Sequence, residues 1–403
     1  MPVCLFLFRR DFRTEGNPAW ARCAGWAAGR GCDVAPCFIY SDRQLDPSRN
    51  AYFSPPAYSE MRAALDGLAG ELGGRLSFFH ARGDAPDTDV LDALARAHDV
   101  SGVFFNSDVT PFAVARDRAI AAWCASRGVP CDGGEPGEGY LLWPAGTVLT
   151  KAGTVPRSFS AFYRYTAGRP LPAPAPAGRP PRLVRLPAPS RRFAVGRLPE
   201  AVPRPPGPSA REALASLERG DFDGYGETRD DYRLPTTRLS VHLKFGRLGA
   251  AEAVAAARRR GVAELERQLL WREYYYHLAA GYPEVLTAPN AHIRPDRQRV
   301  RWGRPDARAA RRWLLGRTGE PLVDQAMAEL RRSGYLHNRL RMVVASYFTR
   351  DMGLDWREGE RLLATLLADY DPCQNSGGWQ SMDAQVPGQE IKASTQLRKY
   401  GPV

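Results

Sequence analysis

The sequence predicts a doubly wound parallel α/β domain followed by an all-helical domain. Three observations support this fold class. Strand and helix patterns alternate through the first part of the chain. A stretch rich in proline and arginine follows, RPLPAPAPAGRPPRLVRLPAPS, whose composition suits an extended linker. Beyond it strand patterns nearly vanish. We therefore expect an α/β domain at 1–132, a linking segment at 133–210 and a helical domain at 211–403.

The first domain shows a regular alternation of elements. Short apolar runs predict buried strands at 2–8, 33–40, 75–80 and 102–106. Amphipathic patterns predict helices at 18–30, 58–73, 88–99 and 112–127. Strands joined by helices of this length form a parallel sheet. No G-x-G-x-x-G follows the first strand, where the loop is Arg9-Arg10-Asp11-Phe12-Arg13, so a dehydrogenase-type dinucleotide site is disfavoured.

The second domain shows helical patterns punctuated by proline and glycine. They predict helices at 210–218, 249–260, 263–280, 306–316, 321–333, 336–350 and 357–368. After the last of these we expect a turn rich in aspartate and asparagine, which carries Asp369, Asp371 and Asn375. The sequence shows no internal repeat.

Composition sets limits on the partners and the compartment. The net charge is +12, carried almost entirely by arginine, which makes a nucleic-acid partner plausible. A bias towards arginine, alanine and glycine through GC-rich coding would explain the same excess. No apolar run reaches the roughly 18 residues of a membrane span, and the N-terminal run is too short for a signal peptide. We expect a monomer that is cytoplasmic, or nuclear in a eukaryote, and not secreted.

The seven cysteines are odd in number, form no C-x-x-C pair and mostly lie in apolar patterns. This usage is typical of reduced, buried thiols. No spacing of cysteine and histidine fits a zinc site, so we expect no metal.

Polar residues within the apolar helices of 335–379 give the strongest functional signal. This stretch carries Arg341, Asp369, Asp371 and Asn375 among helical apolar residues. Unpaired buried polar groups cost roughly 1–3 kcal/mol each, so the region needs a polar partner. A planar, polar cofactor such as a flavin would supply one.

Three further segments are suggestive. Thr236, Thr237 and Ser240 precede a predicted helix, where they fit either simple capping or phosphate binding. The segment QLLWREYYYH at 268–277 is too aromatic for a solvated face, although a core helix would explain it. Three tryptophans, Trp302, Trp356 and Trp379, could equally be core residues.

In combination, and with LFRRDFR at the start, these motifs resemble the photolyase/cryptochrome family over nearly the whole chain. The resemblance implies an α/β antenna domain, a helical FAD-binding domain and light-driven repair of DNA that contains UV-induced pyrimidine dimers. Arg341 and Asp369 would form a buried ion pair, and Asn375 would face flavin N5. The residues implied to bind FAD are Tyr225, Thr236, Thr237, Arg238, Leu239, Ser240, Gln268, Arg272, Asn338, Arg341, Asp369, Asp371 and Asn375.

The resemblance also implies catalytic and lesion-binding residues. Reduced FAD, as FADH⁻, would donate an electron to the dimer without a metal. Trp379, Trp356 and Trp302 would form an electron-transfer chain to the surface, in that order from the flavin, and Gln268 and Asn375 complete the catalytic set. The residues implied to contact DNA are Arg229, Trp271, Arg272, Asn338, Arg339 and Met342.

Several positions depart from the family pattern. Gln268 stands where cyclobutane photolyases carry glutamate, and Ser381 stands where a second lesion-stacking tryptophan is usual. The segment SMDAQVPGQEIKAS differs from the usual loop, and the chain ends earlier than the family normally does. Met342 fits the cyclobutane branch, and only His337 is present where a (6-4) photolyase needs two histidines.

We therefore expect cyclobutane repair. A cryptochrome-like light sensor, a (6-4) photolyase and a flavin-free helical DNA-binding protein are the alternatives. An antenna chromophore, folate or deazaflavin, would lie near the Arg10–Arg13 loop or the Asn106–Asp108 strand end.

Overall fold

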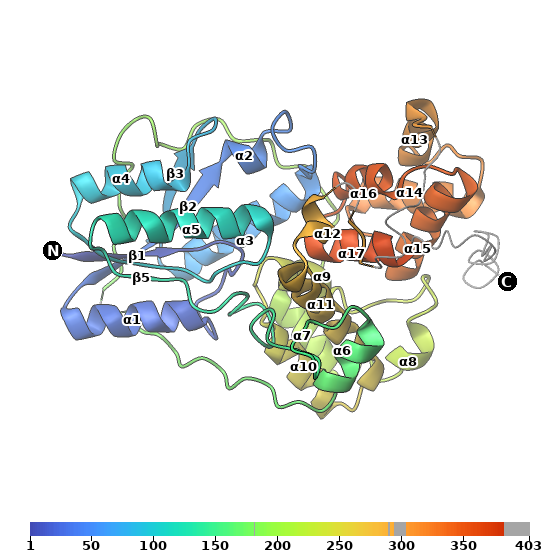
Figure 1. The fold of residues 1–403 in the computed structure, drawn as a ribbon, viewed down its shortest axis with the longest axis horizontal. Helices are drawn as coiled ribbons and strands as arrows, with labels where there is room; N and C mark the ends of the chain where they lie inside the picture. The colour runs from blue at the N-terminus through green and yellow to red at the C-terminus, as the bar shows by residue number, and fades with distance from the viewer. Residues whose placement is uncertain (181, 289–290, 294–303, 383–403) are drawn as a thin grey trace.

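The first domain is built on five parallel strands in the order β3-β2-β1-β4-β5, as seen in a computed structural model that describes residues 1–180, 182–288, 291–293 and 304–382. The strands are β1 (Val3–Leu7), β2 (Asp33–Ser41), β3 (Ser77–Ala81), β4 (Val100–Phe104) and β5 (Cys131–Asp132). The chain moves outward from β1 to one edge and then to the other, which is doubly wound topology. Figure 1 shows this sheet in the left half of the molecule. The predicted fold class is confirmed, and the short β5 was not anticipated.

Helices cover both faces of the sheet. They are α1 (Pro18–Arg30), α2 (Asp42–Leu45), α3 (Pro55–Glu71), α4 (Asp87–Ala97) and α5 (Pro111–Ser126). Helices α1 and α3 pack on one face, around Phe6 and Leu65, whereas α4 and α5 pack on the other, around Leu5 and Ile120. Successive side chains of β1 point to opposite faces, so both faces of this strand are apolar.

The segment 133–210 divides its packing between the two halves of the protein. Its first part contains α6 (Phe159–Thr166), which the sequence did not predict, and Trp143 and Phe162 join the core of the helical domain. Its later part lies on the α/β domain. Leu183 forms an isolated parallel β-bridge with Val34, and Phe193 is buried in the core of that domain. The proline-rich stretch thus packs against the sheet along part of its length.

The second domain is helical throughout the residues that the structure describes. Its elements are α7 (Ala210–Arg219), α8 (Tyr225–Thr228), α9 (Leu239–Lys244), α10 (Ala250–Arg259), α11 (Ala263–Gly281), α12 (Glu284–Thr287), α13 (Ala307–Leu314), α14 (Pro321–Ser333), α15 (Asn338–Ser346), a π-helical turn (Tyr347–Asp351), α16 (Trp356–Ala364) and α17 (Pro372–Met382). Helix α15 begins one residue after His337, whose ring accepts a hydrogen bond from Arg339 N at 3.2 Å.

Helix α17 corrects one expectation. The sequence analysis placed Asn375 in a turn, whereas it lies in the first turns of α17. The physical reason is capping: the Asp371 carboxylate accepts hydrogen bonds from the backbone N–H groups of Cys373 and Gln374, at 3.0 and 3.2 Å. Pro372 occupies the first helical position, where its missing N–H costs nothing.

The remaining predictions on the chain as a whole concern thiols, metals and membranes. All seven cysteines are free, and six of them are buried, as expected. Among the described residues, no group of histidine, cysteine, aspartate or glutamate side chains is arranged to hold a metal ion. No helix in the described part of the chain has the length and apolar character needed to cross a membrane.

Candidate functional site

A cavity of about 740 Å³ lies within the helical domain, between the segment before α9 and helices α11, α15, α16 and α17. Pockets of this size hold cofactors. It brings together side chains that are far apart in the sequence. Of the residues implied to bind FAD or DNA, the cavity is lined by Tyr225, Arg229, Thr236, Thr237, Arg238, Leu239, Ser240, Gln268, Trp271, Arg272, Asn338, Arg339, Arg341, Met342, Asp369, Asp371 and Asn375.

The expected ion pair is present in the wall of this cavity. Arg341 Nη2 lies 2.9 and 2.7 Å from the two carboxylate oxygens of Asp369, and Arg341 Nε donates to Leu336 O at 2.9 Å. The Asp369 side chain is only 4% exposed. Burial acts to lower the pKa of Arg341, but the Asp369 carboxylate outweighs it and the pKa is raised. Arg341 thus stays charged and presents a fixed guanidinium to the cavity.

Asn375 is held by a carboxyl group that the sequence analysis missed. Its amide nitrogen donates to Glu360 Oε1 at 2.8 Å and to Glu360 O at 3.1 Å. Both donors of the amide are therefore used, and its carbonyl oxygen is left for a ligand in the cavity. Burial raises the pKa of Glu360 to about 7. Glu360 lies in α16 among other charged residues, such as Glu358 and Arg361. Its position in the sequence therefore gave no sign that it is buried beside Asn375.

Asp371 joins the two domains. Its Oδ2 accepts from Arg10 Nη2 at 2.8 Å, from Lys244 Nζ at 3.3 Å and from the hydroxyl of Tyr276 at 2.5 Å. Arg10 comes from the loop after β1 and also pairs with Asp108 at 3.4 Å. Burial would raise the pKa of Asp371, but Lys244 and Arg10 hold it well below its ordinary value.

The hydroxyl-rich segment before α9 has an unusual backbone. Arg238 precedes the helix with φ 53°, in the left-handed region that a non-glycine residue rarely occupies. Its guanidinium lies 3.7 Å from the centroid of the Tyr335 ring. No side-chain cap is made at this helix start, so capping does not explain Thr236 and Thr237, which line the cavity instead.

An aromatic wall forms the side of the cavity at α11. The Trp271 ring stacks on Phe159 of α6, with centroids 3.8 Å apart and planes 9° apart. Phe159 therefore backs one face of Trp271. Tyr275 lies one turn further along α11, and its hydroxyl is 3.0 Å from Ser381 Oγ. Gln268 lines the same wall. Tyr275 was seen in the sequence only as part of an aromatic run.

The arginines implied to contact DNA already have partners. Arg229 pairs with Glu264 at 2.6 Å, and Arg339 donates to Asp230 at 2.5 Å. Arg272 donates to Tyr140 O at 2.9 Å and to Glu273 at 3.1 Å, and its side chain is only 12% exposed. A phosphate group would have to compete with these carboxylates.

The tryptophans of the implied electron chain lie in one buried cluster, as far as the structure describes them. Trp379 and Trp356 are both buried there, and Trp379 lines the cavity whereas Trp356 does not. Trp302 falls outside the described residues. Trp313 has a ring contact with Trp379 that the sequence analysis did not anticipate, with centroids 6.1 Å apart.

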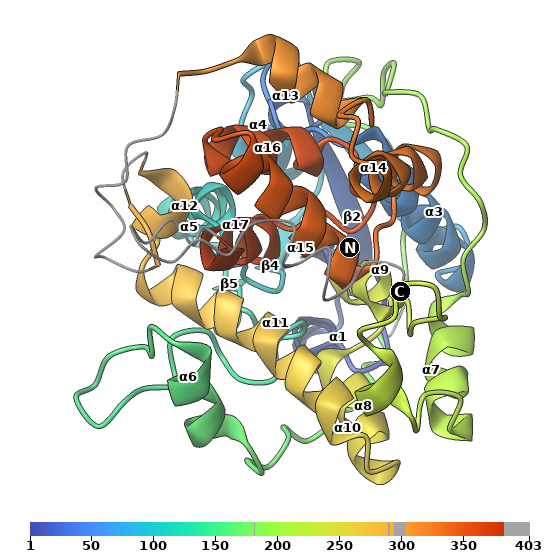
Figure 2. The ribbon, with the colours of Figure 1, turned by 90° about the vertical axis from the view of Figure 1, so that its right-hand side faces the viewer.

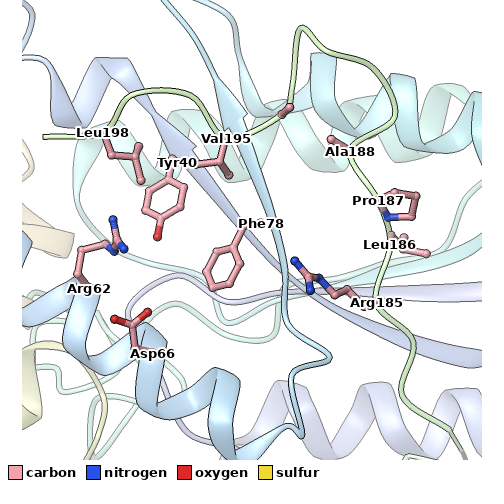
Figure 3. A pocket seen from close by; sticks show the side chains of 11 residues that line it. Tyr40, Arg62, Asp66, Phe78, Arg185, Leu186, Pro187, Ala188, Val195 and Leu198 are labelled. Atoms are coloured by element: carbon pink, nitrogen blue, oxygen red, sulfur yellow. The ribbon is translucent and has the colours of Figure 1, made fainter.

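A second cavity, of about 620 Å³, lies on the α/β domain between α3, the edge of the sheet and the segment 185–198. Figure 3 shows Tyr40 pointing towards Arg62 and Asp66, with Phe78 next to Tyr40 and Arg185 on the far side of Phe78. It is separate from the region where we expected an antenna. There, Arg10, Asn106 and Asp108 are buried against protein groups.

The residues of the first cavity fit FAD. Hydroxyl groups and the cations Arg238 and Lys244 suit a diphosphate, and Arg341, Asp369 and Asn375 offer a donor, a carboxylate and an amide to a polar ring system. At Gly378 an added Cβ would meet no atom within 4 Å, so the backbone of α17 leaves room on the cavity side.

Family models match both halves of the chain. The model described as "DNA photolyase" matches residues 4–180, and that described as "FAD binding domain of DNA photolyase" matches residues 265–403. With the parallel sheet and the cavity, these matches define the class of protein: this chain belongs to the DNA photolyase family and has the family's FAD-binding domain.

Relatives and solved structures agree with this assignment. Deoxyribodipyrimidine photo-lyase of Halobacterium salinarum is 32% identical, over 99% of this chain and 86% of the relative. The enzyme of the same name from Streptomyces griseus is 32% identical, over 94% and 82%. An archaeal photolyase from Sulfolobus tokodaii, solved with two FAD molecules, has a TM-score of 0.77 at 29% identity, over 99% of this chain and 88% of that chain. A class III photolyase from Agrobacterium tumefaciens has a TM-score of 0.78 at 26% identity, over 99% and 84%.

Proposed function

We propose that this protein is a deoxyribodipyrimidine photo-lyase that uses reduced FAD and light to split cyclobutane pyrimidine dimers in DNA. The observation that carries this proposal is the arrangement of one cavity: the Arg341–Asp369 pair and Asn375 on one side, the hydroxyl-rich segment on another and the Trp271 wall at α11. We further propose the division of the chain into an antenna domain at 1–132, a linking segment at 133–210 and a FAD-binding domain at 211–403.

The bound cofactor would supply the electron that opens the dimer after absorbing light. The protein's own residues bind and orient. Thr236, Thr237 and Ser240 would hold the diphosphate, and Arg341 and Asp369 would hold the polar edge of the ring system. Glu360 engages the amide nitrogen of Asn375, so the amide carbonyl oxygen would be available to accept a hydrogen bond from the reduced ring system.

The aromatic wall would receive the lesion. Damaged bases must leave the helical stack, and weakened pairing makes this step less costly. Trp271, backed by Phe159, offers one flat face for stacking, which is worth roughly 1–3 kcal/mol per base. Gln268 can donate and accept hydrogen bonds to the pyrimidine edges. Ser381 provides no second stacking face, so lesion binding depends on Trp271.

A repair assay tests this function. Purified protein is reduced without oxygen, mixed with an oligonucleotide that carries one cyclobutane dimer or one (6-4) product, and illuminated with blue light. We expect the cyclobutane dimer to disappear only in the light. Absence of repair of either lesion by protein that retains its FAD would contradict the proposal.

One observation favours a second candidate, a cryptochrome-like light sensor. Arg229 and Arg339 at the cavity mouth are ion-paired with Glu264 and Asp230, which weakens the attraction for phosphate. A sensor would keep its FAD and respond to light, but would leave both lesions unrepaired. The repair assay therefore separates the two candidates.

Photoreduction tests the proposed electron chain. Trp379→Phe should abolish photoreduction of oxidised FAD and leave repair by chemically reduced protein intact. Trp313→Phe is the matched control, because Trp313 touches Trp379 yet is not part of the proposed chain. Absorbance under illumination is the measurement. Normal photoreduction in Trp379→Phe would refute the assignment, and loss in Trp313→Phe would redirect the path through α13.

A further inference from the structure

Helix α13 presents a row of exposed arginines. Arg308, Arg311 and Arg312 are all exposed on α13, with Arg304 before the helix and Arg317 after it. Positions three and four apart lie on one face of a helix, about 5–6 Å apart at Cβ. The opposite face is buried through Ala310 and Trp313, so the row must face outward.

Within the described part of the chain, these arginines lack the carboxylate partners that the arginines at the end of α10 have. Arg258, Arg259 and Arg260 at the end of α10 pair with Glu266, Glu218 and Asp223. In contrast, no carboxylate among the residues that the structure describes forms an ion pair with Arg304, Arg308, Arg311, Arg312 or Arg317.

Asp306 is the acidic residue closest in sequence to the arginines of α13, and its carboxylate is engaged in capping the helix. Asp306 caps α13 by accepting a hydrogen bond from Ala309 N at 2.9 Å. Like charges at these spacings destabilise a helix. The helix is held in place by Trp313, which is fully buried and donates to Val344 O of α15 at 3.1 Å. The row is thus rigidly attached to a helix that lines the cavity.

The position of α13 fits a long ligand that spans the cavity. In Figure 2, α13 forms the upper edge of the face turned to the viewer, α8 lies in its lower part and α15 lies between them. Both α8 and α15 contribute residues to the cavity, through Tyr225 and Met342. A lesion held at the cavity would leave the flanking duplex to cross this face.

We propose that the arginine face of α13, formed by Arg308, Arg311 and Arg312, is a second DNA-contact surface that binds backbone phosphates of the duplex outside the lesion. The proposal rests on the proposed function, since it takes DNA as the partner. Guanidinium groups pair with phosphate oxygens bidentately, and phosphate contacts position a protein without reading sequence. Phosphate contacts on α13 would compensate for the weak attraction of phosphate by Arg229 and Arg339, which already pair with carboxylates.

The test is the salt dependence of DNA binding. Arg308→Gln, Arg311→Gln and Arg312→Gln are combined in one variant, since glutamine keeps the helix propensity. The matched control removes three other exposed arginines, Arg179, Arg191 and Arg197, from the linking segment. Both variants lose the same net charge. The probes are an undamaged duplex several turns long and a single-stranded oligonucleotide just long enough to hold one dimer.

We expect the slope of log K against log salt for the duplex to fall in magnitude by about 2–3 in the α13 variant, since each phosphate contact contributes about 0.9. The control should keep the wild-type slope, and all three proteins should bind the short lesion equally. A variant with lysine at the three positions keeps the charge and should retain the slope. If the lysine variant retains the slope, replacement of the three arginines does not by itself unfold the protein.

Two results would overturn the proposal: an unchanged slope in the α13 variant, or an equal fall in both glutamine variants. The second result would mean that net charge alone attracts the duplex. Failure of the wild-type protein to bind the short lesion would count against the proposed repair function, and it is measured separately from the slope.

Discussion

Glu360 shows how one buried residue sets the chemistry of its neighbour. Glu360 is 4% exposed and accepts both hydrogen bonds of the Asn375 amide nitrogen, one at its carboxyl group and one at its backbone carbonyl. Burial removes water from the charged carboxylate and so raises the pKa of Glu360 to about 7, although the hydrogen bond from Asn375 acts in the opposite direction. Near neutral pH this group therefore exists in both protonation states.

This shift makes stability depend on pH in a defined direction. Native Glu360 keeps its proton up to about pH 7, whereas the unfolded chain releases it near pH 4.5. The native state is therefore favoured by this group below pH 4.5, and the benefit is lost as pH rises towards 7. Glu360→Gln removes the titration, so its free energy of unfolding relative to wild type should rise over this range, by up to about 3 kcal/mol.

Denaturant unfolding at a series of pH values checks this prediction. Glu360→Asp serves as a control that keeps a carboxyl group but shortens it away from Asn375. A difference between Glu360→Gln and wild type that stays constant from pH 4.5 to 8 would show that Glu360 does not titrate in this range. The bound FAD spectrum reports whether the amide of Asn375 has turned.

At the scale of the element, α17 depends on two neighbouring glycines for different reasons. A Cβ at Gly377 would overlap the ring of Tyr275, because α17 packs directly on α11 there. A Cβ at Gly378 would meet no atom within 4 Å, on the side that lines the cavity. Adjacent positions of one helix thus face a packed interface and an open space.

Alanine at these two positions should have opposite effects. Gly377→Ala should lower the free energy of unfolding by about 1–3 kcal/mol through overpacking, because an aromatic ring cannot yield easily. Gly378→Ala should raise it by about 0.5–1 kcal/mol, since alanine favours a helix more than glycine does. Thermal or denaturant unfolding of both variants measures the effects, and equal stabilities would contradict the packing described for α17.

At the scale of the whole molecule, Arg10 connects the two domains. It reaches from the loop after β1 to Asp371, which caps the start of α17, and to Asp108 of its own domain. Removing one member of a buried charge network leaves the others unpaired and typically costs about 3–5 kcal/mol. The α/β domain therefore helps to fix the helix that carries Asn375 and Trp379.

Two arginine variants separate local from interdomain effects. Arg10→Gln should lower the stability of the whole protein and speed hydrogen exchange in α17. Arg9→Gln is the matched control, because Arg9 is buried but pairs with Asp87 of its own domain at 2.8 Å. Exchange in α17 that is equally fast in both variants would mean that the Arg10–Asp371 contact does not support α17.

The sequence by itself determined the fold class and most of the residues that line the cavity. The fold class depends on local signals, because alternating apolar runs predict the parallel sheet without any knowledge of long-range contacts. The polar residues Arg341, Asp369 and Asn375 among apolar helices indicate a polar ligand, and the resemblance to the photolyase/cryptochrome family supplied the individual residues that line the cavity.

Only the tertiary structure decided which groups hold these residues in place. Glu360 beside Asn375, Arg10 beside Asp371 and Phe159 behind Trp271 are contacts between distant segments, and nothing in their local spacing distinguishes them from ordinary surface or core residues. The same holds for α17, which the sequence presented as a turn. Its helix depends on a cap from Asp371, whose charge is in turn stabilised by cations from two other segments.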